Sequence, residues 1–231
     1  MKKTVLAVAA MLVASSAFAE LSKDEVKRLS EAGPILAELR DSPDKGIPTS
    51  LWEKAQCAVV IPGLKKAAFG VGGEYGSGVM SCRTTAHNGW SAPVFMQLAK
   101  GSLGFQIGAE EIDLVLLVMN RRGLDKLLQD KVSLGADASV AAGPVGRTGE
   151  AATDAQLHAE MLAYSRTKGV FAGIDLSGGV LKPDKEADAR AYGQNANARE
   201  IVTGNKTVHL AAAEPFLRSL RTETRATTGK K

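Results

Sequence analysis

Cysteine and histidine are scarce in this chain of 231 residues, which has two cysteines and three histidines. The sequence contains no C-x-x-C pair, and His87, His158 and His209 do not lie at the spacing of metal ligands. These absences exclude the common zinc-binding patterns. We expect no metal ion and no cofactor.

Long apolar runs are also missing. The apolar run at the N-terminus, Val5–Val13, is well below the ~20 residues that a membrane-spanning helix needs. Two lysines precede it and Ala17-Phe18-Ala19 follows, a combination that is typical of a secretory signal peptide rather than of a membrane anchor. We therefore predict that residues 1–19 are removed after Ala19 and that the protein is exported to the periplasm or secreted.

An excess of one charge sign is absent as well. Lys and Arg total 29, Asp and Glu total 25, and the formal net charge is +4. Two positive charges leave with the predicted signal peptide, and residues 218–231 carry five basic residues against one glutamate. The remaining body is slightly acidic, which excludes a nucleic-acid binder that is basic over its whole surface. We predict one domain over residues 20–217, followed by a flexible basic tail, 218–231.

The two cysteines of the mature chain, Cys57 and Cys82, form an even pair. In an oxidising compartment a disulfide is the simplest state for such a pair. Each cysteine adjoins an apolar run, and two strands of a hairpin-like unit would bring the sulfur atoms within bonding distance. We predict a Cys57–Cys82 disulfide, with two buried thiols as the alternative.

Helical patterns occupy both ends of the predicted domain. Residues 21–41 begin with the capping-box pair Ser22 and Glu25 and carry an apolar stripe, although Pro34 is expected to break or kink the helix. The other predicted helices are 50–56, which also opens on a capping-box spacing, 120–130 with Asn120 as its cap, 184–202 and 211–221.

The middle of the chain has the pattern of strands rich in glycine. A first strand is predicted to end at Pro62-Gly63, and five glycines fall between Gly70 and Gly78. Thr153 and Gln156 resemble a capping box, but strict alternation of apolar and polar residues from 155 to 161 favours a strand there. A hairpin turn is predicted at 166–169. The predicted strands are 57–61, 69–82, 93–99, 101–109, 112–119, 155–161 and 170–181.

Strands that are joined by tight turns and flanked by helices predict the α+β class with antiparallel pairing. Glycines within strands are typical of bulges and strong curvature. We therefore expect a Gly-rich, strongly curved antiparallel sheet or barrel flanked by N- and C-terminal helices, all within a single domain.

Two patterns that suggest enzyme chemistry are incomplete. The segment Gly70–Gly76 departs from the dinucleotide fingerprint because Tyr75 stands where glycine is required and no helix follows. Asp154, His158 and Ser165 supply the residue types of a hydrolase, but Ser165 falls on the other face of the predicted strand and no G-x-S-x-G elbow is present. We expect no enzymatic activity.

Cations at a helix start and in turns are more informative. Arg121 and Arg122 fall in the first turn of a predicted helix, where the helix dipole disfavours positive charge. An anionic ligand would explain them, whereas pairing with Glu110, Glu111 or Asp113 of the preceding strand is the alternative. Three further cations lie in turns from which they could face the same anion: Arg147, Arg166 and Lys168.

An ordered series of short segments resembles the SYLF family of lipid-binding domains. The likeness covers about residues 25–205, and no single segment is specific by itself. The segments are Val60-Ile61-Pro62, Phe69–Gly78, Gly89–Pro93, Gly104–Gly108, Leu134–Asp137, Ala142–Arg147, Tyr164-Ser165-Arg166 and Gly169–Gly173.

The resemblance implies a single α+β domain that binds membrane lipids. A yeast relative also binds actin, a partner that we do not expect an exported bacterial protein to meet. Eukaryotic members attach to membranes partly through a basic N-terminal amphipathic helix. The matching region here, residues 23–28, mixes three basic with two acidic residues, which argues against strong attraction of this helix to anionic membranes.

The expected function is therefore that of a non-enzymatic lipid-binding protein of the bacterial cell envelope, which contacts anionic phospholipid headgroups through basic turns and a helix N-terminus. The alternatives are an envelope adaptor that binds a protein partner through the tail 218–231, and a hydrolase. The residues expected to contact the headgroup are Arg121, Arg122, Arg147, Arg166 and Lys168.

Overall fold

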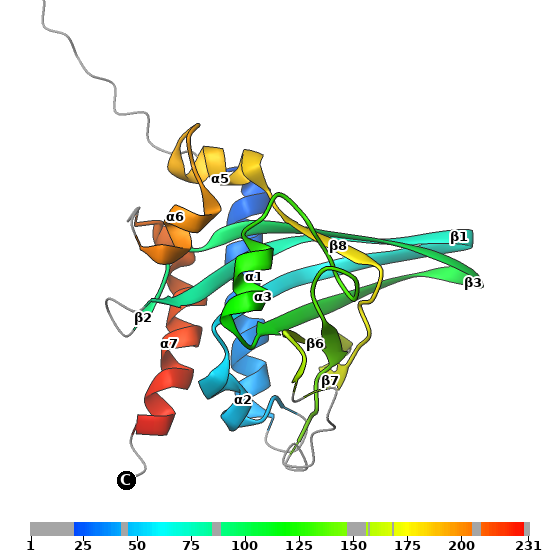
Figure 1. Ribbon diagram of the computed structural model, residues 1–231, viewed down its shortest axis with the longest axis horizontal. Helices are drawn as coiled ribbons and strands as arrows, with labels where there is room; N and C mark the ends of the chain where they lie inside the picture. Colours follow the sequence, from blue (N-terminus) through cyan, green and yellow to red (C-terminus); the bar gives the residue numbers. More distant parts are fainter. Residues whose placement is uncertain are drawn as a thin grey trace, which may run out of the picture.

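A computed structural model of the chain confirms the α+β class, with helices beside a strongly curled eight-stranded sheet (Figure 1). The structure describes residues 21–42, 46–84, 89–146, 156, 158–167, 169–204 and 209–228, without the side chains of 40–41, 68–71, 102–108 and 222–228. Among these residues, no helix has the length and apolar character that crossing a bilayer requires.

Two long strands, β1 (Cys57–Thr84) and β3 (Val94–Val118), pair with each other as one antiparallel ribbon. Cys57, at the start of β1, is bonded to Cys82 near its end, as the sequence predicts. The ribbon therefore runs outward from the helices, turns, and comes back to its starting point (Figure 1). Each long strand contributes two arms to the curled sheet.

The ribbon corrects two expectations about where strands end. Pro62-Gly63 does not stop the first strand, because the register shifts by one residue between Ile61 and Leu64 and pairing then continues. Gly63 adopts a φ of 58° at this bulge and donates its N–H to Asp113 Oδ1 at 2.9 Å. The three strands expected between 93 and 119 are likewise one strand, because β1 pairs with it on both arms.

Two further strands pair with β3 and extend the sheet. β6 (Met161–Thr167) pairs with the returning arm of β3, and β8 (Gly179–Pro183) pairs with its outgoing arm. Thr167 pairs with Val170 across the expected hairpin turn, but the strand expected over 170–181 is divided into β7 (Val170–Gly173) and β8. The short strands are β2 (Gly89–Trp90), β4 (Val132–Ser133) and β5 (Val140–Ala142). Strand β5 runs parallel to β6, whereas the sequence predicts antiparallel pairing.

The strand predicted over residues 155–161 is wrong. Gln156 and His158 are helical, and strand β6 begins only at Met161. The Gln156 side chain donates to the Ala142 carbonyl at 2.8 Å, and the Glu160 carbonyl accepts from the N–H of Met119. Bonds to other elements thus fix this segment, and they outweigh a short alternating pattern in a sequence rich in alanine.

Helix α1 (Lys23–Asp41) begins at the predicted capping box, where the Ser22 N–H donates to Glu25 and the Glu25 N–H donates to Ser22. Pro34 lies inside this helix without ending it. Helix α7 (Glu214–Thr228) packs along α1 through Phe216, Leu217 and Leu220, which are buried. It extends past the expected end at Arg221, so residues 218–228 of the segment expected to be a flexible tail are helical.

The remaining helices are short. Gly193, at a φ of 95°, divides the helix expected over 184–202 into two. Asn120 caps its helix as predicted by accepting from the Gly123 N–H, whereas the helix expected from Ser50 starts one residue earlier after Pro48, without a side-chain cap. These helices are α2 (Thr49–Lys54), α3 (Arg121–Leu127), α5 (Lys185–Tyr192), α6 (Ala198–Thr203) and the 3-10 helix η2 (Ala211–Ala213).

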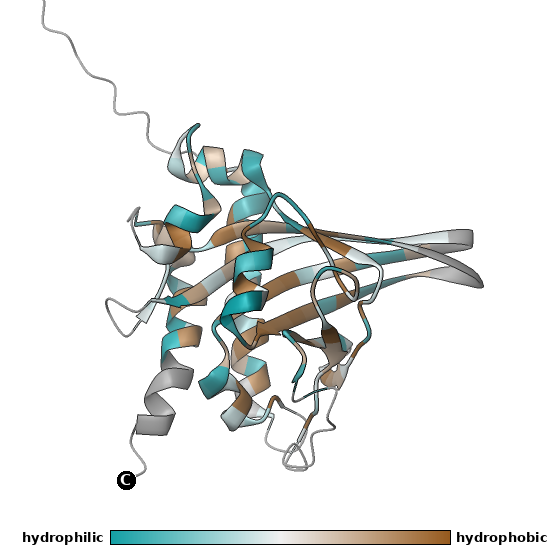
Figure 2. Cartoon of the chain, viewed as in Figure 1, coloured by the Kyte–Doolittle hydropathy of each residue, from teal (hydrophilic) through white to brown (hydrophobic). Residues whose placement is uncertain are grey.

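The core lies between the ribbon and the helices. Residues 114–118 of β3 are fully buried, as expected for a nearly continuous apolar run. The inner side of α1 contributes Leu29, Ile35, Leu36 and Leu39. Figure 2 shows these hydrophobic stretches where the sheet meets the helices. The described part of the ribbon farther from the helices is more polar.

A buried carboxylate joins α5 to the sheet. Asp188 is 2% exposed, and its Oδ1 accepts from the Phe95 N–H at 2.9 Å. Burial raises the pKa of Asp188 to about 7, although the hydrogen bond from Phe95 opposes this, and the nearby charges of Asp184 and Glu25 raise the pKa further. Both of these carboxylates are paired, Asp184 with Arg28 and Glu25 with Arg190.

We predict that the protein loses stability as the pH rises from about 4 to about 7. In this range folded Asp188 holds a proton that the unfolded chain has released, so the free energy of unfolding falls by up to about 1.4 kcal/mol per pH unit. Asp188→Asn keeps an acceptor for the Phe95 N–H and should remove most of this slope. Urea unfolding of both proteins between pH 5 and pH 8 measures the slope, and an equal slope in D188N would contradict the prediction.

Candidate functional site

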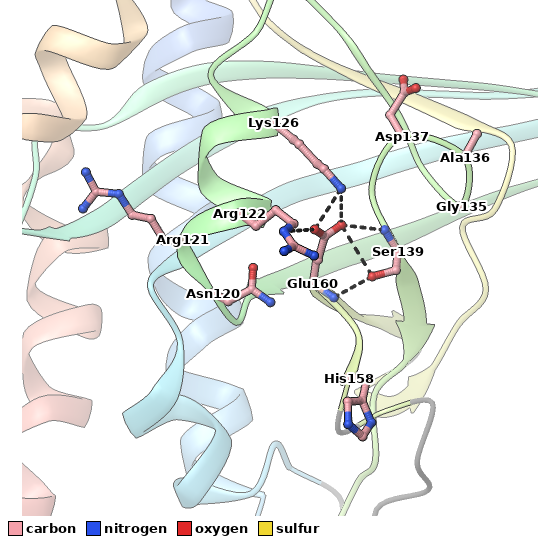
Figure 3. Close-up of a pocket in the computed structure, with 10 residues that line it drawn as sticks. All are labelled: Asn120, Arg121, Arg122, Lys126, Gly135, Ala136, Asp137, Ser139, His158 and Glu160. Carbon is pink, nitrogen blue, oxygen red and sulfur yellow. Dashed lines mark hydrogen bonds and ion pairs between the residues drawn. The ribbon is translucent and has the colours of Figure 1, made fainter.

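An open pocket of about 600 Å³ lies between α3, the loop that joins β4 to β5, and the residues before β6 (Figure 3). Two of the five predicted headgroup residues, Arg121 and Arg122, line it. Three cations face two carboxylates in its wall, which gives a net charge of +1 with His158 neutral. The lining residues are Asn120, Arg121, Arg122, Lys126, Gly135, Ala136, Asp137, Ser139, His158 and Glu160.

Glu160 organises this pocket. The Lys126 ammonium lies 2.8 and 2.7 Å from its two carboxylate oxygens, and the Ser139 N–H donates to Oε2 at 2.9 Å. The Glu160 N–H in turn donates to the Ser139 hydroxyl. Burial disfavours the ionised carboxylate, but the hydrogen bonds from Lys126 and Ser139 outweigh burial and hold the pKa of Glu160 below its usual range.

Arg122 and Lys126 stand one turn apart on α3 and both point toward Glu160 (Figure 3). The guanidinium of Arg122 is 81% exposed, and its Nε lies 3.9 Å from Glu160 Oε1, at the edge of ion-pair distance. Arg121 is exposed and points away from Glu160. The alternative that Arg122 pairs with a carboxylate of the preceding strand is wrong, because the carboxylate next to Arg122 is that of Glu160.

Arg166 does not belong to this pocket. Its guanidinium is paired with Glu38 of α1 and with Asp113 of β3, whose Oδ2 lies 2.5 Å from Nη2 and 2.7 Å from Nε. Asp113 also accepts from the Gly63 N–H of β1. These contacts tie α1, β1, β3 and β6 together. The side chain is 22% exposed, which indicates a structural role rather than contact with the same anion as Arg122.

The other predicted site residues are separated or lie outside the described residues. Arg147, Lys168 and Asp154 fall in the latter group. His158 lines the pocket, whereas Ser165 does not and lies on β6 beside Arg166. The described members of the possible hydrolase set are therefore not brought together. No group of three or more metal-ligating side chains occurs among the residues that the structure describes.

Sequence reasoning missed three residues of the pocket, Lys126, Ser139 and Glu160. No local motif marks them, because their partners lie 21 or 34 positions away along the chain. In the sequence, Glu160 directly precedes the apolar run Met161–Tyr164, which is consistent with a polar position in the predicted alternating strand.

Comparison with known proteins finds a matching family model and several similar proteins of eukaryotes. The family model Ysc84, described as Las17-binding protein actin regulator, matches residues 99–223. The SH3 domain-containing protein PJ696.02 of Schizosaccharomyces pombe is 33% identical over 209 residues, 87% of this chain and 47% of the relative. Protein YSC84 of Saccharomyces cerevisiae is 34% identical over 180 residues, 77% of this chain and 38% of the relative.

A vertebrate relative is similar to the same degree. The SH3 domain-containing YSC84-like protein 1 of Xenopus laevis is 36% identical over 185 residues, which are 79% of this chain and 54% of that protein. The chain thus spans about half, or less, of the length of the curated relatives that it matches.

Proposed function

This chain belongs to the Ysc84 family, the SYLF family that its sequence resembles, and we propose that it is a non-enzymatic lipid-binding protein of the bacterial cell envelope. The proposed contact is between anionic headgroups and the pocket cations Arg121, Arg122 and Lys126. Phosphate oxygens would accept hydrogen bonds from the two guanidinium groups at the mouth of the pocket.

The exposure of Arg122 is the observation that carries this proposal. Glu160 already accepts hydrogen bonds from Lys126 and Ser139, so it does not require Arg122 to balance its buried charge. The guanidinium of Arg122 lines the pocket while most of it faces solvent. An anion that enters the pocket would meet Arg122 without first displacing a strong internal partner.

We predict that Arg121→Gln with Arg122→Gln weakens binding to phosphatidylglycerol-containing vesicles roughly tenfold or more, because each cation near an anionic surface contributes on the order of 1 kcal/mol. Binding by the parent protein should also fall steeply with added salt. Vesicle co-sedimentation of the purified protein measures both effects.

The matched control removes the same charge from α1, through Lys23→Gln with Lys27→Gln, two exposed positions. This variant should bind nearly as the parent protein does. Equal losses in the two double variants would show that binding depends on overall charge, and unchanged binding in R121Q/R122Q would show that the pocket is not the headgroup site.

A protein-binding adaptor is the second candidate, because the family description and relatives name binding partners and SH3 domains. Here the contact would involve the basic residues near the C-terminus. Phe216, Leu217 and Leu220 hold the first half of α7 against α1, so deletion of residues 222–231 should leave the fold intact. Loss of vesicle binding in this deletion would favour the tail over the pocket.

We also propose that residues 1–19 are removed on export. The Cys57–Cys82 disulfide supports this, because disulfides persist mainly in oxidising compartments outside the cytoplasm. The intact mass of protein purified from the periplasm should correspond to residues 20–231 less two hydrogens. A mass that includes residues 1–19 would contradict the proposal.

A further inference from the structure

The far end of the β1–β3 ribbon is divided into a charged zone and an uncharged zone. Three cross-strand pairs of opposite sign form what we call the collar: Lys65 with Glu111, Lys66 with Glu110, and Glu74 with Lys100. The Lys66 ammonium also lies 3.7 Å from Glu74, across the two arms of β1. The collar carries three positive and three negative charges, so it is neutral overall.

Beyond the collar lies what we call the tip, residues 67–73 of β1 and 101–109 of β3, which contains no charged residue. Backbone pairing continues through it, for example between Phe69 and Ile107 and between Val71 and Leu103. The sequence of the tip supplies five large apolar residues, namely Phe69, Val71, Leu103, Phe105 and Ile107.

The described residues at the base of the tip face solvent. Ala67 and its partner Ala109 are exposed, and so are Gly73 and its partner Gly101. A Cβ atom added to Gly101 would meet no atom within 4 Å. Among the described residues, the pairing of β8 with β3 ends at Lys100 and that of β6 ends at Asp113. The ribbon thus projects beyond the rest of the sheet (Figure 1).

Tyr75 stands beside the collar, on the side that faces the rest of the sheet, and pairs with Ala99. It is 54% exposed, and it directly follows the collar residue Glu74. Tyrosine favours the interface between membrane and water, because its ring is apolar and its hydroxyl hydrogen-bonds to polar groups. A charged collar with an exposed aromatic ring beside it, followed outward by an uncharged projection, matches the polarity of a lipid bilayer from its headgroups inward.

We propose that the tip inserts into the surface layer of a lipid bilayer, with the collar at the level of the headgroups. A strand rises about 3.3 Å per residue, so the three or four residues between collar and turn reach about 10–13 Å. Shallow interfacial insertion reaches about 5–10 Å, which this length covers. Because the collar is neutral, the insertion needs no anionic lipid, and it differs from the proposed headgroup contact in residues and in lipid requirement.

The test uses vesicles of phosphatidylcholine alone, which carry no net charge. The purified protein should co-sediment with them, and Phe105→Asp should reduce this binding at least tenfold. Val170→Asp is the matched control, because Val170 is an apolar residue of β7 that is 44% exposed, away from the ribbon. Equal binding by F105D and the parent protein would overturn the proposal.

A second variant keeps the test independent of the folding of F105D. In Phe105→Trp, tryptophan fluorescence should shift to the blue when phosphatidylcholine vesicles are added, and brominated phosphatidylcholine should quench it. The buried Trp52 and Trp90 contribute a constant background to this signal. A blue shift without vesicles that grows with protein concentration would mean that a second copy covers the tip, which overturns membrane insertion. Binding to anionic vesicles alone also overturns it, while leaving the headgroup proposal in place.

Discussion

Gly78→Ala is expected to destabilise the protein by about 3 kcal/mol or more, because an added Cβ would force two backbone segments apart. The Cβ would lie 2.0 Å from the Val60 carbonyl oxygen and 2.7 Å from the Ile61 Cα, both on the other arm of β1. Neither backbone atom can move without disturbing the pairing of Val60 and Ile61 with β3. The glycine therefore permits the ribbon to fold back on itself.

Gly101→Ala is the matched control for this prediction. It also adds one methyl group to a strand glycine of the same ribbon, but no atom lies within 4 Å of the new Cβ. Its free energy of unfolding should remain within about 0.5 kcal/mol of the parent value. For a chain of this size the 3 kcal/mol loss in G78A corresponds to a fall in Tm of about 6–12 °C. Similar Tm values for the two variants would refute the steric explanation.

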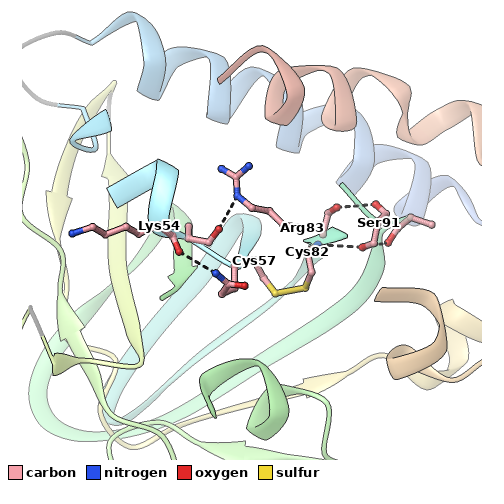
Figure 4. Close-up of a disulfide and its surroundings, with 9 residues drawn as sticks. Lys54, Cys57, Cys82, Arg83 and Ser91 are labelled. Atoms are coloured by element: carbon pink, nitrogen blue, oxygen red, sulfur yellow. Dashed lines mark hydrogen bonds between the residues drawn. A yellow bond between two sulfur atoms is a disulfide. The ribbon is translucent and has the colours of Figure 1, made fainter. Parts of the chain in front are cut away.

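Removal of the Cys57–Cys82 disulfide is expected to cost about 3 kcal/mol, because the bond joins positions 25 residues apart and restricts the unfolded chain. Both cysteines are buried where the two arms of the ribbon return to the helices (Figure 4). Cys57→Ala with Cys82→Ala should lower Tm by several degrees, as measured by thermal unfolding without reductant.

The protein is nevertheless expected to remain folded without this disulfide. The Arg83 N–H donates to the Gln56 carbonyl at 2.8 Å, and the Arg83 side chain donates to the carbonyls of Ala55 and Trp52 at 2.9 Å. The same guanidinium lies 4.7 Å from the centre of the Trp90 ring. These contacts hold the two arms at the same place as the disulfide.

Reductant provides the control for the disulfide prediction. It should lower the Tm of the parent protein toward that of the double alanine variant and leave the variant itself unchanged. A variant that is unfolded at room temperature would mean that the contacts of Arg83 do not suffice, and a variant as stable as the oxidised parent would mean that the bond contributes nothing.

The fold class was accessible from the sequence because it depends on local patterns that the structure retains. The capping box of Ser22 and Glu25 begins α1, Asn120 begins α3, and the apolar run 112–119 lies in the centre of the sheet. The glycines between 70 and 78 also indicated curvature correctly. Their number could not show that a single strand folds back on itself, because this requires the contact between Gly78 and Val60.

The candidate site was accessible only in part. Arg121 and Arg122 were identified because a helix start disfavours cations, and this is a local rule. Arg166 was chosen as a cation in a predicted turn, yet β6 places it between Glu38 and Asp113, and these partners are 128 and 53 positions away in the chain. Glu160 gave no clear local signal, although it orders the pocket around Arg122 and Lys126.

The sequence by itself thus determined the class of the domain, the pairing of its only two cysteines and the starts of two helices, because neighbouring residues govern capping, curvature and turn formation. The tertiary structure decided which charges neutralise one another and which remain exposed, because strand register and helix docking bring together residues that are far apart in the chain. It also joined residues 67–73 to 101–109, and so turned two uncharged segments into one projecting tip.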